Sequence, residues 1–238
     1  YESYMQKLRE RKGIVEERIV GQEFRSPSVQ LRVTPLGKVE LLSTHDQLLG
    51  RPSGQSYLDC VFPSDTAYAR LITREAEKVG KRLAKEGVIG RFALDFVVVR
   101  GKNGKWEPYA IEINLRKGGT THPYIMLQFL TDGDYDAAKG EYITANGQKR
   151  VYFCSDNLRS EQFHGLTPPD LVDIAMLHDL HYDGTLQEGV MFHLIGALSQ
   201  FGKIGVVCIG SSAEKAKEYY NKAVEVLQLE TVHQLYTH

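Results

Sequence analysis

Three residues with metal-binding oxygen atoms lie close together in the sequence: Asp95, Glu112 and Asn114. All three stand in otherwise apolar segments, which read FALDFVVV and YAIEINL. Two carboxylates and an amide, with no Cys or neighbouring His, form a hard set of oxygen ligands. Such a set suits Mg²⁺ held together with substrate phosphates, and does not suit zinc.

A β-hairpin is the element that would position these side chains. Segments 92–100 and 106–114 are both rich in β-branched and aromatic residues, and glycine, lysine and asparagine fill the turn between them. The period of two in a strand puts Glu112 and Asn114 on one face. Asp95 can lie opposite them if the register of the hairpin is right. The alternative is that these acids are charges of an edge strand that point to solvent.

The spacing of Asp95 on one strand and E-I-N-L-R (112–116) on the next resembles the metal-binding end of an ATP-grasp ligase. This resemblance implies that Asp95, Glu112 and Asn114 hold the Mg²⁺ ions that bridge the phosphates of ATP. It also implies that Arg116 faces the acyl-phosphate or its attacking nucleophile. Because the whole set falls on one predicted hairpin, we favour this interpretation over solvent-exposed charges.

A predicted strand at residues 14–24 resembles the hinge of the same superfamily. There the resemblance implies that Glu16 and Ile19 bond the adenine edge, largely through backbone groups, and that Glu23 accepts hydrogen bonds from the ribose. ATP and Mg²⁺ are therefore the expected cofactors. The N-terminal half of that fold carries a glycine-rich loop and a phosphate-binding Lys or Arg, and it would precede Tyr1. We therefore expect this chain to be the C-terminal part of a longer protein or of a larger assembly.

Further motifs narrow the resemblance. The segments SPSVQ, STHDQ, GQSYL, FPSD and EINLRKGGTTHP are similar to the ATP-grasp module of the pheganomycin-type peptide ligases. The similarity continues through SDNL, GVMFHLIGAL and GKIGVVCIG, so it covers nearly the whole chain. In that family small residues, usually Gly, stand where this sequence has Arg51 and Asp59. These two departures leave the conformation of the loop and its substrate contacts open.

The loop after Asn114 places two cations and two glycines beside the predicted metal site. Glycine lets backbone N–H groups approach an anion closely, and arginine can donate two hydrogen bonds to a phosphate or carboxylate. Thr121 and His122 are expected to open a helix over 123–130. We favour an anion site here over a glycine-rich helix entry with incidental charge. His122 is either a general base for an incoming amine or a cap of the helix.

Segment 26–60 predicts two strands around a turn at 35–38, with alternating apolar and polar residues. The polar positions Gln30 and Arg32 either look into the nucleotide cleft or face solvent. His45 and Asp46 are adjacent on a strand and point to opposite faces, so we do not expect a catalytic dyad. A helix capped at Ser64 or Asp65 should precede the hairpin.

The chain has 238 residues, is 42% hydrophobic and 25% charged, and has a formal net charge of −1. A net charge close to zero does not favour nucleic acid as a partner. No apolar run approaches the ~20 residues of a membrane span, and the charged N-terminal residues lack a signal-peptide core. Cys60, Cys154 and Cys208 are widely spaced and resemble the reduced thiols of an intracellular protein. We therefore expect a cytoplasmic protein without membrane or nucleic-acid partners.

The C-terminal third predicts helices at 167–180 and 213–229, strands at 189–198 and 203–209, and a surface turn at DGDYD (132–136). His178, His181 and His193 lack convincing metal spacing, and His193 is expected to be a core histidine. We predict a mixed α+β fold: residues 1–148 form the C-terminal part of an ATP-grasp domain with an antiparallel sheet, and residues 149–238 form an α/β appendage.

Taken together, the residues and the resemblance predict an ATP-dependent carboxylate–amine ligase of the peptide type that acts through an acyl-phosphate. Its partners would be small-molecule or peptide substrates, one with a carboxylate and one with an amine. The alternative is a catalytically inactive nucleotide-binding or structural scaffold module in a larger protein. The metal triad favours the enzyme, since buried acids that repel each other serve no purpose in a scaffold.

Overall fold

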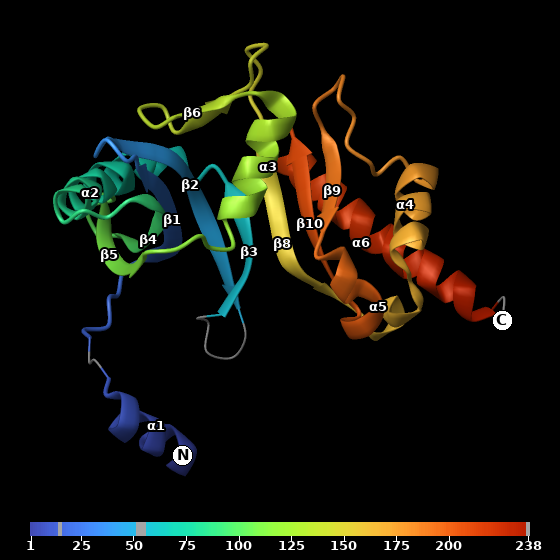
Figure 1. Cartoon of the computed structure of the whole chain (residues 1–238), viewed down its shortest axis with the longest axis horizontal. Coiled ribbons are helices and arrows are strands. Elements are labelled where there is room, and N and C mark those ends of the chain that lie inside the picture. Colours follow the sequence, from blue (N-terminus) through green and yellow to red (C-terminus); the bar gives the residue numbers. More distant parts are fainter. Residues whose placement is uncertain (14–15, 51–55, 237–238) are drawn as a thin grey trace.

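The computed structural model describes residues 1–13, 16–50 and 56–236, and its main element is one large antiparallel sheet (Figure 1). Neighbouring strands follow in the order β5-β4-β1-β2-β3-β8-β10-β9. These strands are β1 (Glu23–Val33), β2 (Val39–Gly50), β3 (Ser56–Phe62), β4 (Gly90–Arg100), β5 (Trp106–Asn114), β8 (Val151–Arg159), β9 (Gly189–His193) and β10 (Lys203–Gly210). The predicted mixed fold with an antiparallel sheet is confirmed.

The helices cover the two faces of this sheet unequally. They are α1 (Glu2–Arg11), α2 (Thr66–Lys85), α3 (Thr121–Thr131), α4 (Pro168–Leu177), α5 (Leu198–Phe201) and α6 (Ala213–Tyr236), with short 3-10 turns η1 (Glu161–Gly165) and η2 (Ile195–Ala197). Helices α2 and α6 lie on one face, over two apolar clusters, and α3 lies on the other (Figure 1). Among the described helices, none lies over β4, β1 and β2 on that second face, where Gln30, Gln47 and Asp95 line a cavity.

Apolar and polar side chains alternate along strand β1, and this alternation explains why the two faces of the sheet differ. Val29, Leu31 and Val33 are buried against α2, whereas Ser28 and Gln30 point to the opposite face. Their neighbours across the sheet continue the pattern, because Ser28 pairs with Asp95 and Gln30 with Ala93. One face is therefore an apolar core and the other carries hydrogen-bonding groups.

Helix α2 forms where its sequence predicted. The Asp65 side chain accepts a hydrogen bond from the Ala67 backbone at 2.8 Å and caps the first turn. Tyr68, Ile72 and Ala76 recur at helical spacing and are buried against the sheet. The helix thereby fixes the strands that carry the polar face.

The predicted strand at residues 14–24 is largely wrong. Of its described residues, 16–22 have no regular structure, and β1 begins at Glu23. Glu23 pairs with Arg100, the last residue of β4, so no partner strand extends beyond this point. Residues 14–15 lie outside the described chain.

The C-terminal third differs from its prediction in three places. The segment predicted as a surface turn contains β6 (Asp134–Asp136), which pairs with β7 (Glu141–Ile143). Strand β9 ends at His193 because Leu194 adopts a left-handed conformation, with φ of 55°. The sequence at 152–154 predicts only a short strand, whereas β8 is longer and pairs with both β3 and β10, so the C-terminal strands extend the same sheet. The division of the chain at residue 148 stays a prediction.

The N-terminal helix α1 lies apart from the rest of the molecule (Figure 1), and none of its residues is buried. Among the described helices, none combines the length and the apolar character that crossing a membrane requires.

Candidate metal and nucleotide site

The β4–β5 hairpin brings the three predicted metal ligands together. Asp95 pairs directly with Glu112, and Ala93 pairs with Asn114, so the three side chains lie on the face not covered by α2. The Asn114 amide nitrogen donates a hydrogen bond of 2.8 Å to Oδ2 of Asp95. This bond leaves the carbonyl oxygen of Asn114 free to act as a ligand. A bulge follows Asp95 in the pairing and shifts the register of the outer part of the hairpin.

Asp95 is the half-buried carboxylate of this group. Its Oδ1 accepts a hydrogen bond of 2.8 Å from the side chain of Gln47 on β2. Burial raises the pKa of Asp95, and the nearby Glu112 charge acts in the same direction, while the hydrogen bonds from Gln47 and Asn114 oppose the rise. Glu112 itself is exposed. Two amide donors thus hold a carboxylate in a position where its charge is costly without a cation.

These residues line one cavity of about 270 Å³ together with the loop that follows β5. The lining comprises Gln30, Gln47, Tyr57, Ala93, Asp95, Glu112, Asn114, Arg116, Gly118, Gly119 and Thr120. The predicted catalytic Arg116 is therefore in the same cavity as the predicted metal ligands. Its guanidinium is exposed and donates to the Lys117 carbonyl at 3.3 Å, so it is free to turn toward a ligand.

The loop between β5 and α3 is fixed by buried hydrogen bonds. The Gly118 backbone N–H donates to Oγ1 of Thr121 at 3.0 Å, and Thr121 donates to the side chain of Gln30 at 3.2 Å. Gln30 also contacts Thr120. Of the two alternatives for the polar positions of β1, Gln30 faces the cavity, whereas Arg32 is exposed and pairs with Glu40.

The residues predicted to bind adenine lie in a different place from the residue predicted to bind ribose. Glu16 and Ile19 line a second cavity of about 420 Å³, whose other wall is formed by Tyr109, Ala110 and Ile111 of β5. Glu23 is not among the residues of this cavity and instead accepts a hydrogen bond of 2.8 Å from Arg100. Strand β5 borders both cavities. Glu112 and Asn114 line the first cavity, and residues 109–111 line the second.

Sequence reasoning missed Gln47 and Tyr57, which line the first cavity. Gln47 belongs to the segment STHDQ, but its contact with Asp95 depends on the register across β1, which no local pattern gives. Of the two departures from the resembled family, Arg51 lies outside the described residues. Asp59 pairs with Ser155 in the sheet. The pKa of Tyr220 on α6 is raised mainly by burial, and the nearby charge of Asp59 raises it further. Asp59 therefore faces α6 and not the cavity.

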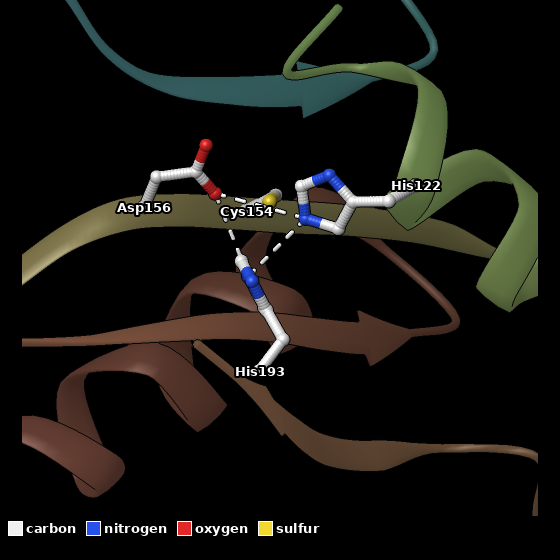
Figure 2. A group of neighbouring side chains, drawn as sticks. All are labelled: His122, Cys154, Asp156 and His193. Atoms are coloured by element: carbon white, nitrogen blue, oxygen red, sulfur yellow. Dashed lines mark hydrogen bonds and ion pairs between the residues drawn. The ribbon is translucent and has the colours of Figure 1, made fainter. Parts of the chain in front are cut away.

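His193, predicted to be a core histidine, has a side chain that is only 13% exposed, but it also has neighbours that the prediction did not include. Its ring lies beside that of His122, with ring centroids 4.4 Å apart, and both rings face Asp156 (Figure 2). His122 does not cap α3 either, because Thr120 is the N-cap residue and no side-chain cap bond is present there. His45 and Asp46 do point to opposite faces, as predicted: His45 contacts Tyr152 and Asp46 contacts Tyr68.

Two family profiles match the sequence. Residues 1–138 match the family described as "IQCH-like, ATP-grasp", and residues 170–223 match the "PGM1 C-terminal domain". Among curated proteins, an L-propargylglycine–L-glutamate ligase of Streptantibioticus cattleyicolor is 32% identical over 95% of this chain, and the chain spans 45% of that protein. The IQ motif-containing protein H of Danio rerio is 29% identical over 43% of this chain, which spans 10% of that protein.

Solved structures agree in fold. The N5-carboxyaminoimidazole ribonucleotide synthetase of Thermus thermophilus superposes with a TM-score of 0.56 at 13% identity, over 94% of this chain and 57% of that one. The L-amino acid ligase of Bacillus licheniformis gives 0.54 at 16% identity, over 94% of this chain and 58% of that one. The chain thus spans little more than half of these proteins. On the match of its first 138 residues, the chain belongs to the IQCH-like ATP-grasp family.

Proposed function

We propose that this chain carries the metal site and part of the nucleotide site of an ATP-dependent carboxylate–amine ligase. The observation that carries the proposal is the convergence of Asp95, Glu112, Asn114 and Arg116 in one cavity beside a glycine-containing loop. Carboxylate and amide oxygens on one side, and a guanidinium with backbone N–H groups on the other, match a phosphate chain that carries a divalent cation.

The residues present fit Mg²⁺. Asp95 and Glu112 provide two carboxylates from paired strands, and Asn114 provides an amide oxygen on the same face. The set contains no sulfur or imidazole, which favours a hard cation. A bound Mg²⁺ would neutralise phosphate charge during transfer of the terminal phosphoryl group. It would also offset the electrostatic cost of the half-buried Asp95 carboxylate.

The chain's own groups then have distinct roles. Gln47 and Asn114 hold Asp95 in a fixed orientation through hydrogen bonds of 2.8 Å each. Arg116 would stabilise the negative charge that develops when an amine attacks an acyl-phosphate. The Gly118–Thr120 loop, held by the bonds of Thr121 and Gln30, would keep this geometry constant.

The second cavity is our proposed adenine site. Glu16 and Ile19 face Tyr109 and Ile111 across it, which combines backbone groups with apolar walls. Glu23 would have to release Arg100 to accept hydrogen bonds from a ribose. The name of the Streptantibioticus relative gives two amino acids, so we propose amino-acid or short-peptide substrates that supply a carboxylate and an amine.

Calorimetric titration of ATP, with and without Mg²⁺, tests this proposal on the longest natural protein that contains the chain. We expect affinity that depends on Mg²⁺ and that falls by more than ~100-fold in Asp95→Asn/Glu112→Gln, because both carboxylate ligands are lost. ADP release with candidate acids and amines then tests ligation.

Matched controls separate the metal site from general effects of charge removal. Asp46→Asn removes a half-buried acid on the opposite face of the sheet, where Asp46 accepts from Tyr68 at 2.7 Å, and Glu77→Gln removes an exposed acid on α2. Neither should change ATP affinity. If the whole protein binds no ATP, the enzyme proposal is wrong and the scaffold alternative stands.

A further inference from the structure

A second group of metal-binding atoms lies outside the proposed nucleotide site. It consists of His122 in the first turn of α3, Cys154 and Asp156 on β8, and His193 at the end of β9. One ligand atom from each of the four lies within 4.8 Å of the others. Figure 2 shows the two imidazole rings and the carboxylate directed toward a common point, with the sulfur behind them.

Three of these atoms form a compact triangle. Nε2 of His122 lies 3.4 Å from Nε2 of His193, and Oδ1 of Asp156 lies 3.7 and 3.5 Å from the two nitrogens. A tetrahedral zinc ion with bonds of about 2.0–2.1 Å holds its nitrogen and oxygen ligands roughly 3.3 Å apart. The triangle is therefore only slightly larger than one face of such a coordination sphere.

The two ring nitrogens form a long hydrogen bond with each other, but no hydrogen bond satisfies the Asp156 carboxylate oxygen. Distances of 3.5 and 3.7 Å from carboxylate to imidazole exceed those of good hydrogen bonds. Oδ1 of Asp156 is buried, has no hydrogen-bond partner and points at both rings. A buried carboxylate oxygen without a partner is costly, and a cation at the centre of the triangle would satisfy all three atoms at once.

Both imidazole rings are partly buried. Burial lowers the pKa of His193 to about 4, with the neighbouring His122 acting in the same direction, and burial also lowers the pKa of His122. The neutral imidazole, whose second nitrogen keeps its lone pair, is the form of histidine that binds metal ions. A backbone hydrogen bond at Val206 also engages His193, as outer partners of metal-binding histidines commonly do.

Two further residues, Gly205 and Cys154, form the walls around the His122–Asp156–His193 triangle. Gly205 is the strand partner of His193, and a Cβ at this position would collide with the imidazole ring, so glycine is what admits the ring. Cys154 is fully buried and its thiol interacts with Cys60, which raises its pKa well above the usual value. We therefore assign Cys154 to the wall of the site. The side chain of His122 is 40% exposed, so a solvent molecule can reach the remaining coordination position.

We propose that His122, Asp156 and His193 form a second metal site, which binds a transition-metal cation of the zinc type through two imidazole nitrogens and one carboxylate oxygen. The site leaves one position open, as sites with three protein ligands do. It is separate from the Mg²⁺ site proposed above and does not depend on the proposed function.

Zinc titration of this chain, in competition with a chromophoric chelator, tests the proposal. We expect one Zn²⁺ per chain and a loss of more than ~100-fold in affinity in His122→Gln, His193→Gln and the nearly isosteric Asp156→Asn, because each removes a ligand. Co²⁺ should give the visible absorption bands of a four-coordinate ion, without a thiolate charge-transfer band, because Cys154 belongs to the wall and is not a ligand.

Controls make the result decisive. His164→Gln, which changes a surface histidine near Glu161, and Asp95→Asn/Glu112→Gln should both keep the full zinc affinity. Circular dichroism establishes that each variant is folded. The proposal is overturned if the chain binds no zinc, if the folded ligand variants bind it as tightly as the natural sequence, or if binding disappears with Asp95 and Glu112.

Discussion

The oxygen group on the β4–β5 hairpin and the imidazole group beside α3 share one face of the same sheet, but they are built in different ways. Asp95 and Asn114 are 19 residues apart in the chain, and their hydrogen bond follows from the register of a single hairpin. His122 and His193 are 71 residues apart and meet only after α3 has packed over the sheet and β9 has joined its edge.

The two groups also differ in chemistry. Asp95, Glu112 and Asn114 offer oxygen atoms alone, whereas the second group offers two imidazoles and one carboxylate. Hard cations prefer the first set and zinc-type cations prefer the second. Neighbouring sites on one sheet can therefore select different cations by ligand type alone, and the following variants should affect one site and spare the other.

The largest effect is expected from Gly205→Ala. Its Cβ would displace the His193 ring without removing any ligand, so zinc affinity should fall by about 100-fold, as for loss of a ligand, while Mg²⁺-dependent ATP binding stays unchanged. Zinc and ATP titrations of the same preparation check this. Gly196→Ala is the matched control, because a Cβ there meets nothing within 4 Å. Unchanged zinc affinity in a folded Gly205→Ala protein would contradict our placement of the metal.

A smaller effect is expected from Gln47→Leu, which removes the amide donor to Oδ1 of Asp95. Loss of such an outer partner should weaken Mg²⁺-dependent ATP binding by about 10-fold. Zinc affinity should not change, because Gln47 is not part of the imidazole group. Calorimetry at several Mg²⁺ concentrations measures the effect. An equal loss of affinity for ATP alone, without Mg²⁺, would mean that Gln47 contacts the nucleotide and not the metal ligand.

The smallest effect concerns stability without metal. Because burial raises the folded-state pKa of Asp95, its ionised form costs stability at every pH above that pKa. Asp95→Asn should therefore raise the melting temperature in EDTA at pH 7 by on the order of 1–2 °C. The gain should shrink as the pH falls through the raised pKa and vanish below the ordinary aspartate value of about 3.9. Thermal unfolding at several pH values measures it, and a melting temperature that falls at pH 7 would contradict the electrostatic explanation.

The sequence predicts the local hairpin of the first site well, but not the contacts between distant segments that build the second site. The hairpin, α2 and the joint presence of Asp95, Glu112 and Asn114 could be predicted because their patterns are local. The contact between Gln47 and Asp95, 48 residues apart, depends on the pairing of three strands. The place of His193 required knowing that β9 ends where it does and that its partner is a glycine.

The prediction of a strand at residues 14–24 failed for a related physical reason. The apolar pair Ile19–Val20 suggests a strand, but strand structure needs a partner, and β4 ends at Arg100 opposite Glu23. Composition describes what a segment can form, whereas the length of its neighbour decides whether it does. The roles of Glu16, Ile19, Glu23 and Arg116 in binding stay predictions until nucleotide binding is measured.

The start of α3 imposes a limit on insertions and deletions. Gly118, Gly119 and Thr120 line the first cavity, and His122 reaches the imidazole group from the first turn of the helix. One residue added or removed between Thr120 and His122 would rotate the histidine by about 100° around the helix axis and aim it away from Asp156. Relatives that keep both sites should therefore conserve the spacing of this segment, whereas relatives that have lost one are free to vary it.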